Sequence, residues 1–246
     1  MPSVLSPLSD VPETGVQVWT AHIEKLSPGE VAGLGALLDA DEQARAGRFH
    51  FDRDRRLYVS SRGLLRRLIG DALGQPPSAL HFEYGAHGKP AISSASFKGR
   101  TLCFNLSHSA GWAMFALAWD REVGIDLESA ARLQRDANGL AALAARVLSA
   151  RELKIWQALP NNEARVAAFL RAWTRKEAYA KAIGGGLFEH LIRAEVALDA
   201  AAPISSLSLP SSEPGQSKRS WILHDIKAPG GFFAALALEQ IVGQLG

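Results

Sequence analysis

Two acidic residues lie in an alternating segment, VGIDLE, that runs from Val123 to Glu128. In a β-strand, residues two apart share a face, so Asp126 and Glu128 project together while the apolar residues between them enter the core. Paired carboxylates suit a hard divalent cation such as Mg²⁺, which typically takes one or two carboxylates, water and substrate phosphates. The polar face of an edge strand would show the same alternation, so this segment leaves both interpretations open.

A second candidate pair lies on a predicted helix over residues 163–183. Its apolar stripe runs from Val166 to Trp173, and the same spacing continues to Glu177 and Lys181. A stripe that becomes charged at its end is typical of a helix that leaves the core and enters a cleft, where both groups can meet a ligand. An exposed Glu–Lys pair four residues apart is the alternative, worth about 0.2–0.5 kcal/mol.

Candidate phosphate-binding residues occur in two other segments. Ser107, His108 and Ser109 follow a predicted strand, where two hydroxyls, an imidazole and turn N–H groups can donate to phosphate oxygens, although a hydrogen-bonded turn could use them equally. A nucleophilic Ser107 is disfavoured, because no glycine-flanked elbow or identifiable partner acid accompanies it. Lys89 lies between a glycine and a proline, which fix a turn that could aim its ammonium at a phosphate.

The composition indicates an ordinary globular protein. The chain has 246 residues, of which 47% are hydrophobic, and can bury one sizeable core or two smaller ones. Its formal net charge is only +2, so no global field favours nucleic acid. Local clustering still matters, because eight arginines lie between residues 45 and 67 against two aspartates, and we expect most of them to be solvated: Arg45, Arg48, Arg53, Arg55, Arg56, Arg62, Arg66 and Arg67.

The location follows from the cysteine count and the apolar segments. Cys103 is the single cysteine and cannot form an intrachain disulfide. We expect it to be a small core residue, and we expect the protein to function in a reducing compartment. No basic region followed by an apolar stretch opens the sequence, and no window approaches the roughly 18 apolar residues of a membrane helix. We therefore expect a cytoplasmic protein with no membrane span.

Hydrophobic periodicity predicts the elements that must position these residues. We expect strands at 16–21, 102–106, 113–119, 122–128 and a final pair within 221–238, and a helix over 53–73. Ser149 and Glu152 have capping-box spacing, with Pro160 ending that helix, and the glycines from Gly184 end the helix over 163–183. The Ser- and Pro-rich stretch 200–220 is interpreted as an exposed loop.

The two parts of the sequence echo each other weakly. Tyr58 and Gly63 resemble Tyr179 and Gly184 at a displacement of 121 residues, and the Gly–Trp at 111–112 resembles the Gly–Phe at 231–232 at a displacement of 120. The shared displacement predicts an α+β protein of two similar α/β halves packed as an intrachain pseudo-dimer, residues 1–120 and 121–246, with a ligand cleft between them.

Taken together, these motifs resemble those of the 4′-phosphopantetheinyl transferases of the larger, surfactin-synthetase-activating type. The specific likeness lies in GIDLE at 124–128 and WTRKEAYAK at 173–181. FNLSHS at 104–109, GKP at 88–90 and RFHFDRD at 48–54 match in order and approximate spacing, so the resemblance spans about residues 45–187. The Ser- and Pro-rich insertion near residue 200 departs from the shorter members of the family.

The resemblance implies a fold, a reaction and a set of site residues. It implies a monomer of two similar halves that moves the phosphopantetheine arm of coenzyme A onto a serine of an apo acyl carrier protein or a peptidyl or aryl carrier domain, releasing 3′,5′-ADP. Asp126, Glu128 and Glu177 would bind Mg²⁺, and Lys181 would contact the departing phosphate. The other implied contacts are to the nucleotide and its phosphates, with the two arginines near the 3′-phosphate: Arg45, Arg48, Lys89, Ser107 and His108.

The resemblance leaves the base open, and two other functions compete with it. Glu177 is the candidate base for the serine, directly or through a water. A metal-dependent phosphohydrolase could use the same three carboxylates, with water in place of serine. A nucleic-acid-binding module would use the arginine-rich helix and show steeply salt-dependent binding, which the near-neutral net charge disfavours.

Overall fold

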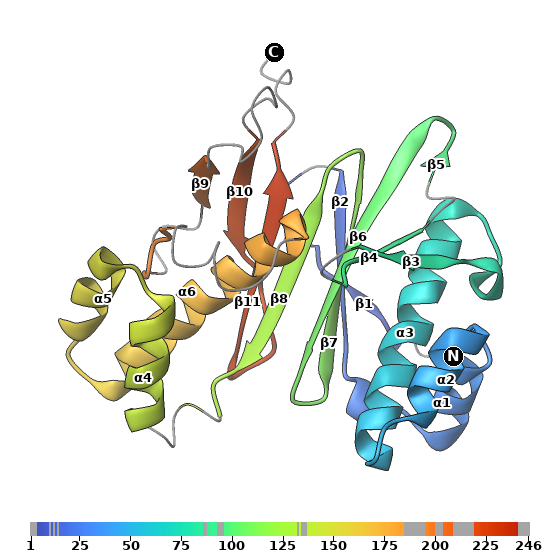
Figure 1. Cartoon of the computed structure of the whole chain (residues 1–246), viewed down its shortest axis with the longest axis horizontal. Helices are drawn as coiled ribbons and strands as arrows, with labels where there is room; N and C mark the ends of the chain where they lie inside the picture. Colours follow the sequence, from blue (N-terminus) through green and yellow to red (C-terminus); the bar gives the residue numbers. More distant parts are fainter. Residues whose placement is uncertain are drawn as a thin grey trace.

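The computed structural model describes residues 4–9, 11, 13, 15–85, 88–92, 96–131, 133, 137–184, 195–199, 204–208 and 219–240. Its main features are two antiparallel sheets, each crossed by one helix of 22 residues (Figure 1). The first sheet has the order β1-β2-β7-β6-β5 and the second the order β8-β11-β10-β9. A small hairpin of β3 (Phe82–Tyr84) and β4 (Pro90–Ile92) lies beside the first sheet.

The strands of the first sheet are β1 (Ser6–Pro7), β2 (Val16–Ala21), β5 (Ser96–Phe97), β6 (Arg100–Ser109) and β7 (Trp112–Trp119). Those of the second are β8 (Val123–Ser129), β9 (Ile204–Ser208), β10 (Ser220–Asp225) and β11 (Phe232–Glu239). The α-helices of the described residues are α1 (Pro28–Gly35), α2 (Ala40–Gly47), α3 (Asp52–Leu73), α4 (Ala137–Val147), α5 (Ala150–Gln157) and α6 (Asn162–Ile183). The sheet with α1, α2 and α3 forms one half of the molecule, and the sheet with α4, α5 and α6 forms the other (Figure 1).

Three apolar cores hold these layers together. In one, α3 packs on its sheet through Leu65 and Ile69 against Phe115 of β7. In the second, α6 packs on the other sheet through Phe169 and Ala178. The third core joins the two sheets, because residues of β2 and β7 contact residues of β8 and β11: Val16, Val18, Met114, Ala116, Val123, Ile125, Leu127, Leu236 and Leu238.

Most predicted elements are confirmed. The strand at 16–21 and the helices near 53–73 and 163–183 form with boundaries within one residue of those expected. Ser149 and Glu152 make both hydrogen bonds of a capping box at the start of α5, and Gly184 ends α6 in the left-handed conformation, with φ of 63°. The sequence patterns missed α1, α2 and α4.

Two expectations need correction, and a third concerns residues outside those described. The stretch 200–220 is not all loop, because β9 at 204–208 pairs with β10 and extends the sheet; the other residues of that stretch up to 218 lie outside those described. Gly185 and Gly186 also lie outside the described residues. Cys103 is a free thiol that is only half-buried, since it packs at the margin of the inter-sheet core.

The internal similarity predicted between the two halves is present in the fold, but one of the two predicted glycine matches is different. β7 and β11 each follow a glycine with positive φ, 81° at Gly111 and 80° at Gly231, as the displacement of 120 requires. The helix match was wrong, because Gly63 lies inside α3, where a Cβ would approach Leu34 Cβ to 2.6 Å. By position in the fold, Gly184 corresponds to Gly74, which ends α3 with the same φ of 63°.

No described helix has the length and apolar character needed to cross a bilayer.

The contact between β8 and α6 depends on a glycine. A Cβ added to Gly124 would lie 2.5 Å from Ala182 N and still closer to Ala178 O, and backbone atoms of a packed helix cannot yield as a flexible side chain can. The absence of a side chain at this position therefore allows α6 to approach β8 closely.

We expect Gly124→Ala to destabilise the fold by about 1–3 kcal/mol, since the methyl group overpacks the sheet–helix contact. Gly230→Ala is the matched control, because nothing lies within 4 Å of a Cβ there. Denaturant unfolding of both variants measures the difference. Equal stability of the two variants would contradict the close-approach argument.

Candidate active site

The two sheets meet at the site through side chains of β6. The N–H groups of Ile125, Leu127 and Ser129 in β8 donate to oxygens of β6 side chains at 3.0, 3.2 and 3.2 Å. The acceptors are, in the same order, Asn105 Oδ1, Ser107 Oγ and Ser109 Oγ. We call these three contacts the side-chain ladder. Since β8 is the edge strand of its sheet, the ladder satisfies N–H groups that β11 does not pair.

The ladder residues also contact the predicted acids. Ser107 Oγ donates to Asp126 Oδ1 at 2.9 Å, and Ser109 Oγ donates to Glu128 Oε2 at 3.3 Å. Trp173 of α6 donates from Nε1 to Glu128 Oε1 at 3.3 Å. Glu128 is therefore held from both halves of the molecule.

Glu177 of α6 lies close enough to these acids to be repelled by them. Burial and then the negative charge of Asp126 raise the pKa of Glu177 to about 7, with a smaller contribution from Glu128 and an opposing one from Lys181. Burial and then Asp126 also raise the pKa of Glu128. Asp126 is 3% and Glu177 5% exposed, so water screens this repulsion weakly.

Lys181 is the ammonium that faces the acids. Its Nζ lies 2.7 Å from Asp126 Oδ1, 2.9 Å from Ser107 Oγ and 3.3 Å from Ile125 O. The described residues include no group of three His, Cys, Asp or Glu side chains arranged closely enough to hold a metal ion. Asp126, one of the three predicted ligands, is instead in contact with the Lys181 ammonium.

The donor chemistry nevertheless fits a cation. Asp126 Oδ2 and Glu177 Oε1 are buried carboxylate oxygens with no hydrogen-bond partner among the described residues. Buried acceptors without a donor are costly, and one lysine faces three carboxylates that repel one another. A divalent cation would supply the missing charge and the missing contacts.

Lys89 and His108 take different positions around this centre. Lys89 Nζ lies 2.5 Å from Glu122 Oε2 and 2.6 Å from Ala182 O, so it ties the β3–β4 hairpin to the end of α6. His108 lies within β6 and not, as the sequence predicted, in a turn after the strand. Part of its surface is exposed, and desolvation of the imidazole and then the Lys181 charge lower its pKa. The structure therefore brings His108, Ser107 and Lys181 near one another and engages Lys89 in a contact between the halves.

Arg45 and Arg48 line a separate cavity of about 280 Å³ on the first half, together with Glu42, Tyr58 and Tyr84. Arg45 is stacked over the Tyr58 ring, with its Cζ 5.5 Å from the ring centroid. Both arginines are exposed and available to an anion.

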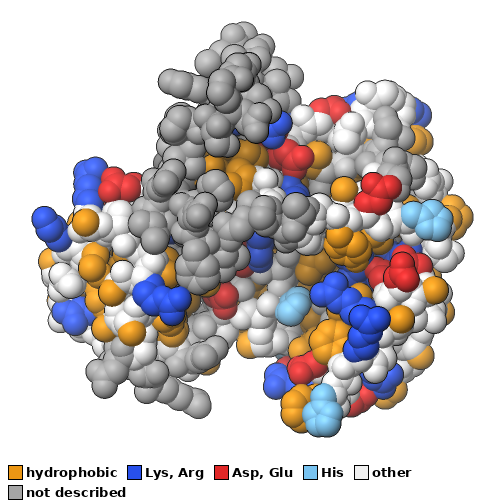
Figure 2. Space-filling model, in the orientation of Figure 1, with side chains coloured by type: hydrophobic (Ala, Val, Ile, Leu, Met, Phe, Trp, Pro, Cys, Tyr) orange, Lys and Arg blue, Asp and Glu red, His pale blue; other side chains and the backbone are white. Residues whose placement is uncertain are grey.

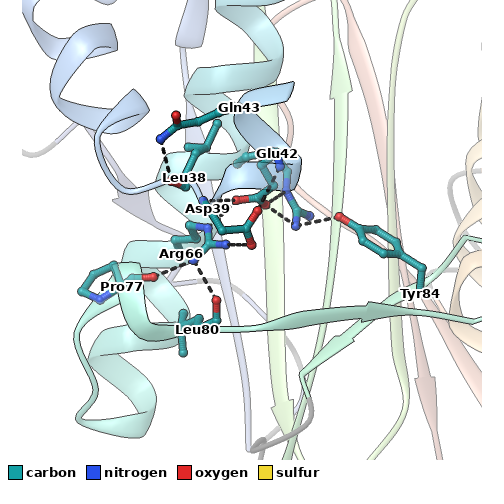
Figure 3. Close-up of polar contacts among 9 residues, drawn as sticks. Leu38, Asp39, Glu42, Gln43, Arg66, Pro77, Leu80 and Tyr84 are labelled. Atoms are coloured by element: carbon teal, nitrogen blue, oxygen red, sulfur yellow. Dashed lines mark hydrogen bonds and ion pairs between the residues drawn. The ribbon is translucent and has the colours of Figure 1, made fainter. Parts of the chain in front are cut away.

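A buried ion-pair network contributes Asp39, Glu42 and Tyr84 to the lining of that cavity. Figure 3 shows the polar contacts of this network. Arg66 donates to Glu42, Asp39, Pro77 O and Leu80 O, and Arg62 contacts both Glu42 and Tyr84. Arg62 and Arg66 are therefore structural residues, 6% and 0% exposed, although no sequence pattern distinguished them from the solvated arginines nearby.

An apolar cavity of about 510 Å³ opens beside Glu128. Its walls come from the turn after β6, the end of β8, and helices α4 and α6: Ser109, Ala110, Glu128, Ser129, Ala131, Leu133, Leu143, Phe169, Leu170 and Trp173.

Sequence reasoning assigned no role to Asn105 or Trp173, and it assigned Ser109 only a hydroxyl that could donate to phosphate oxygens. A signal for Asn105 and Ser109 was present, because polar residues at 105, 107 and 109 share one face of a strand. Trp173 was interpreted as part of an apolar stripe, and nothing in the sequence indicated that its indole N–H reaches Glu128.

Two family models match this chain in succession. Residues 122–237 match the 4′-phosphopantetheinyl transferase superfamily, and residues 25–119 match the 4′-phosphopantetheinyl transferase N-terminal model. The chain belongs to the 4′-phosphopantetheinyl transferase superfamily, and it is a transferase.

Individual relatives agree with this assignment. The 4′-phosphopantetheinyl transferase HetI of Nostoc sp. is 37% identical over 196 residues, 80% of this chain and 79% of the relative. The L-aminoadipate-semialdehyde dehydrogenase-phosphopantetheinyl transferase of Xenopus laevis is 32% identical over 163 residues, 63% of this chain, and the match spans about half, 52%, of that relative. A phosphopantetheinyl transferase of Thraustochytrium sp. is 27% identical over 217 residues, 83% of this chain and 73% of the relative.

The raised pKa of Glu177 predicts a pH-dependent stability of the metal-free protein. A carboxyl whose folded-state pKa is about 7 against a usual value of 4.5 destabilises the fold as pH rises through this interval. In EDTA, Glu177→Gln should therefore gain stability over the unmodified chain at pH 8, by up to about 3 kcal/mol, and much less at pH 5.

Glu163→Gln, at the exposed start of the same helix, is the control and should show no such pH-dependent gain. Unfolding in denaturant at both pH values gives the comparison. A Glu177→Gln variant whose stability difference is the same at pH 5 and pH 8 would contradict the buried repulsion.

Proposed function

We propose that this transferase moves the 4′-phosphopantetheine arm of coenzyme A onto a serine hydroxyl of an apo acyl carrier protein, or of a peptidyl or aryl carrier domain, and releases 3′,5′-ADP. The observation that carries the proposal is the pair of buried carboxylate oxygens, Asp126 Oδ2 and Glu177 Oε1, that lack a partner among the described residues and lie near Glu128 and the Lys181 ammonium. This arrangement suits a cation and a diphosphate, which are the charged parts of such a reaction.

In this proposal Asp126, Glu128 and Glu177 hold Mg²⁺, a hard cation that prefers carboxylate oxygens. When bound, Mg²⁺ supplies charge neutralisation to the diphosphate of coenzyme A. Lys181 contacts Asp126 through its ammonium. With substrate bound, this ammonium would turn in part from Asp126 to a phosphate oxygen and stabilise the charge of the departing 3′,5′-ADP.

The remaining binding roles follow from the positions of the other residues. Ser107 and His108 are beside Lys181 and would contact the phosphates, and Lys89 would do so on release from Glu122. Arg45 and Arg48 would bind the 3′-phosphate from their cavity on the first half. The apolar cavity beside Glu128 suits the uncharged pantetheine arm.

The chemical step forms a bond between the serine oxygen and the phosphorus of the arm, and breaks the bond from that phosphorus to the bridging oxygen. The bridging oxygen leaves on 3′,5′-ADP with the bonding electron pair. The proton of the serine passes to Glu177, directly or through a water.

We further propose that the chain functions as a cytoplasmic monomer of two halves, residues 1–120 and 121–246. β6 of the first half and β8 and α6 of the second supply the site within one chain. The free thiol of Cys103 is compatible with a reducing compartment.

Neither alternative function gains support. The family and its relatives are transferases, which disfavours a phosphohydrolase. On the face shown in Figure 2, lysine and arginine side chains are interspersed with acidic and apolar ones, unlike the continuous basic surface of a nucleic-acid-binding module.

We expect Asp126→Ala and Glu177→Ala to abolish transfer while the chain stays folded, because each removes a carboxylate that would hold the cation. Mass spectrometry of an apo-carrier protein, after incubation with the variant, coenzyme A and Mg²⁺, measures the transfer, and Glu163→Gln is the control. Normal rates in either alanine variant would remove the metal assignment. Release of 3′,5′-ADP without a carrier would favour the phosphohydrolase instead.

We expect His108→Ala to weaken coenzyme A binding by about 1.5–3 kcal/mol, as for the loss of a charge-assisted hydrogen bond. His50→Ala, another exposed histidine of the first half, is the control. Calorimetry gives both affinities. Unchanged affinity in His108→Ala would exclude the imidazole from the phosphate site.

A further inference from the structure

The edge of β8 that carries the acids is anchored by side chains and not by a neighbouring main chain. β8 pairs with β11 on one side, and the described residues provide no main-chain pairing on the other. The side-chain ladder supplies the three missing acceptors from alternate residues of β6. The anchor therefore comes from the other half of the molecule.

The ladder alternates with the acids along β8. Its donors, Ile125, Leu127 and Ser129, are the neighbours in sequence of Asp126 and Glu128. Fixing these three N–H groups fixes the backbone on both sides of each acid. The Ser109 hydroxyl in addition donates to the Glu128 carboxylate, so one side chain sets both the backbone and a carboxylate oxygen.

Asn105 contributes at the other end of the ladder. It is 5% exposed, and its Oδ1 accepts the N–H of Ile125, a residue with no exposed surface. An amide in this position needs a specific partner, because a buried polar group without one is unfavourable. Asn105 thus meets β8 at one fixed position along the strand.

We propose that Asn105 and Ser109 are positioning residues of the transfer reaction: they hold β8 in place against the first half, and so set where Asp126 and Glu128 lie relative to Glu177 of α6. The inference rests on the proposed function, since it assumes that these three acids bind Mg²⁺ with coenzyme A.

The test compares the affinity for coenzyme A in Mg²⁺ with that in EDTA, by calorimetry. The quotient, the affinity in Mg²⁺ divided by the affinity in EDTA, measures how much the cation strengthens coenzyme A binding. A general defect lowers both affinities and leaves the quotient unchanged. Ser109→Ala and Asn105→Leu should lower the quotient by about tenfold, the lower end of what outer partners of metal ligands contribute. The EDTA affinity should stay unchanged in Asn105→Leu, whereas Ser109 also lines the cavity beside Glu128.

Two further variants make the result specific. Ser109→Thr keeps the hydroxyl and suits a strand, so it should restore the quotient. Thr20→Val removes a hydroxyl from the same sheet, one that contacts Ala113 O in β7, and should behave as the unmodified chain. Hydrogen exchange of the Ser129 amide should become faster in Ser109→Ala and not in Thr20→Val, which confirms that the variant is folded and has lost the intended contact.

Three results would overturn the proposal. One is an unchanged quotient in Ser109→Ala together with faster exchange at Ser129. Another is an equal loss of affinity in Mg²⁺ and EDTA, which would make the ladder a general support of the fold. The third is a quotient of one in the unmodified chain, which would refute the metal assignment itself; this failure of the proposed function is distinguishable because it needs no variant.

Discussion

Repulsion among buried carboxylates is the constraint around which the site is organised. Asp126, Glu128 and Glu177 come from two elements; Asp126 and Glu177 are buried and Glu128 is partly buried, so the fold must hold together carboxylates that would separate if free. Lys181 offsets part of the repulsion, and the pKa of Glu177 still rises to about 7. This arrangement lowers the stability of the protein alone, and the proposed cation would relieve the repulsion.

The rest of the architecture provides the rigidity that such a site needs. Gly124 allows α6 to lie directly on β8, which fixes the separation of the helix acid from the strand acids. The side-chain ladder fixes β8 from the other half, and Lys89 joins the hairpin of that half to the end of α6. The acids are thus positioned from both sides, and each of these devices depends on one or two specific residues.

Much of this could be predicted from the sequence, for reasons that differ between elements. The strand at 16–21 and the helices α3 and α6 have clear periodicity and end signals, and the motifs around Asp126 and Glu177 carried the family resemblance. Helices α1 and α2 were missed because they are only eight residues long, too short for a periodic stripe to stand out. The partners of Arg66, Lys89 and Trp173 were beyond prediction, because each contact joins elements far apart in sequence and depends on the packing of the whole fold.

The core between the two sheets has a consequence for how the molecule assembles. Two separate chains with such faces would meet at a rate and to an extent set by their concentration. Here the short connection between β7 and β8, residues 120–122, keeps the halves at a high effective concentration. The pairing of the sheets, and the site that depends on it, is therefore independent of how dilute the protein is in the cell.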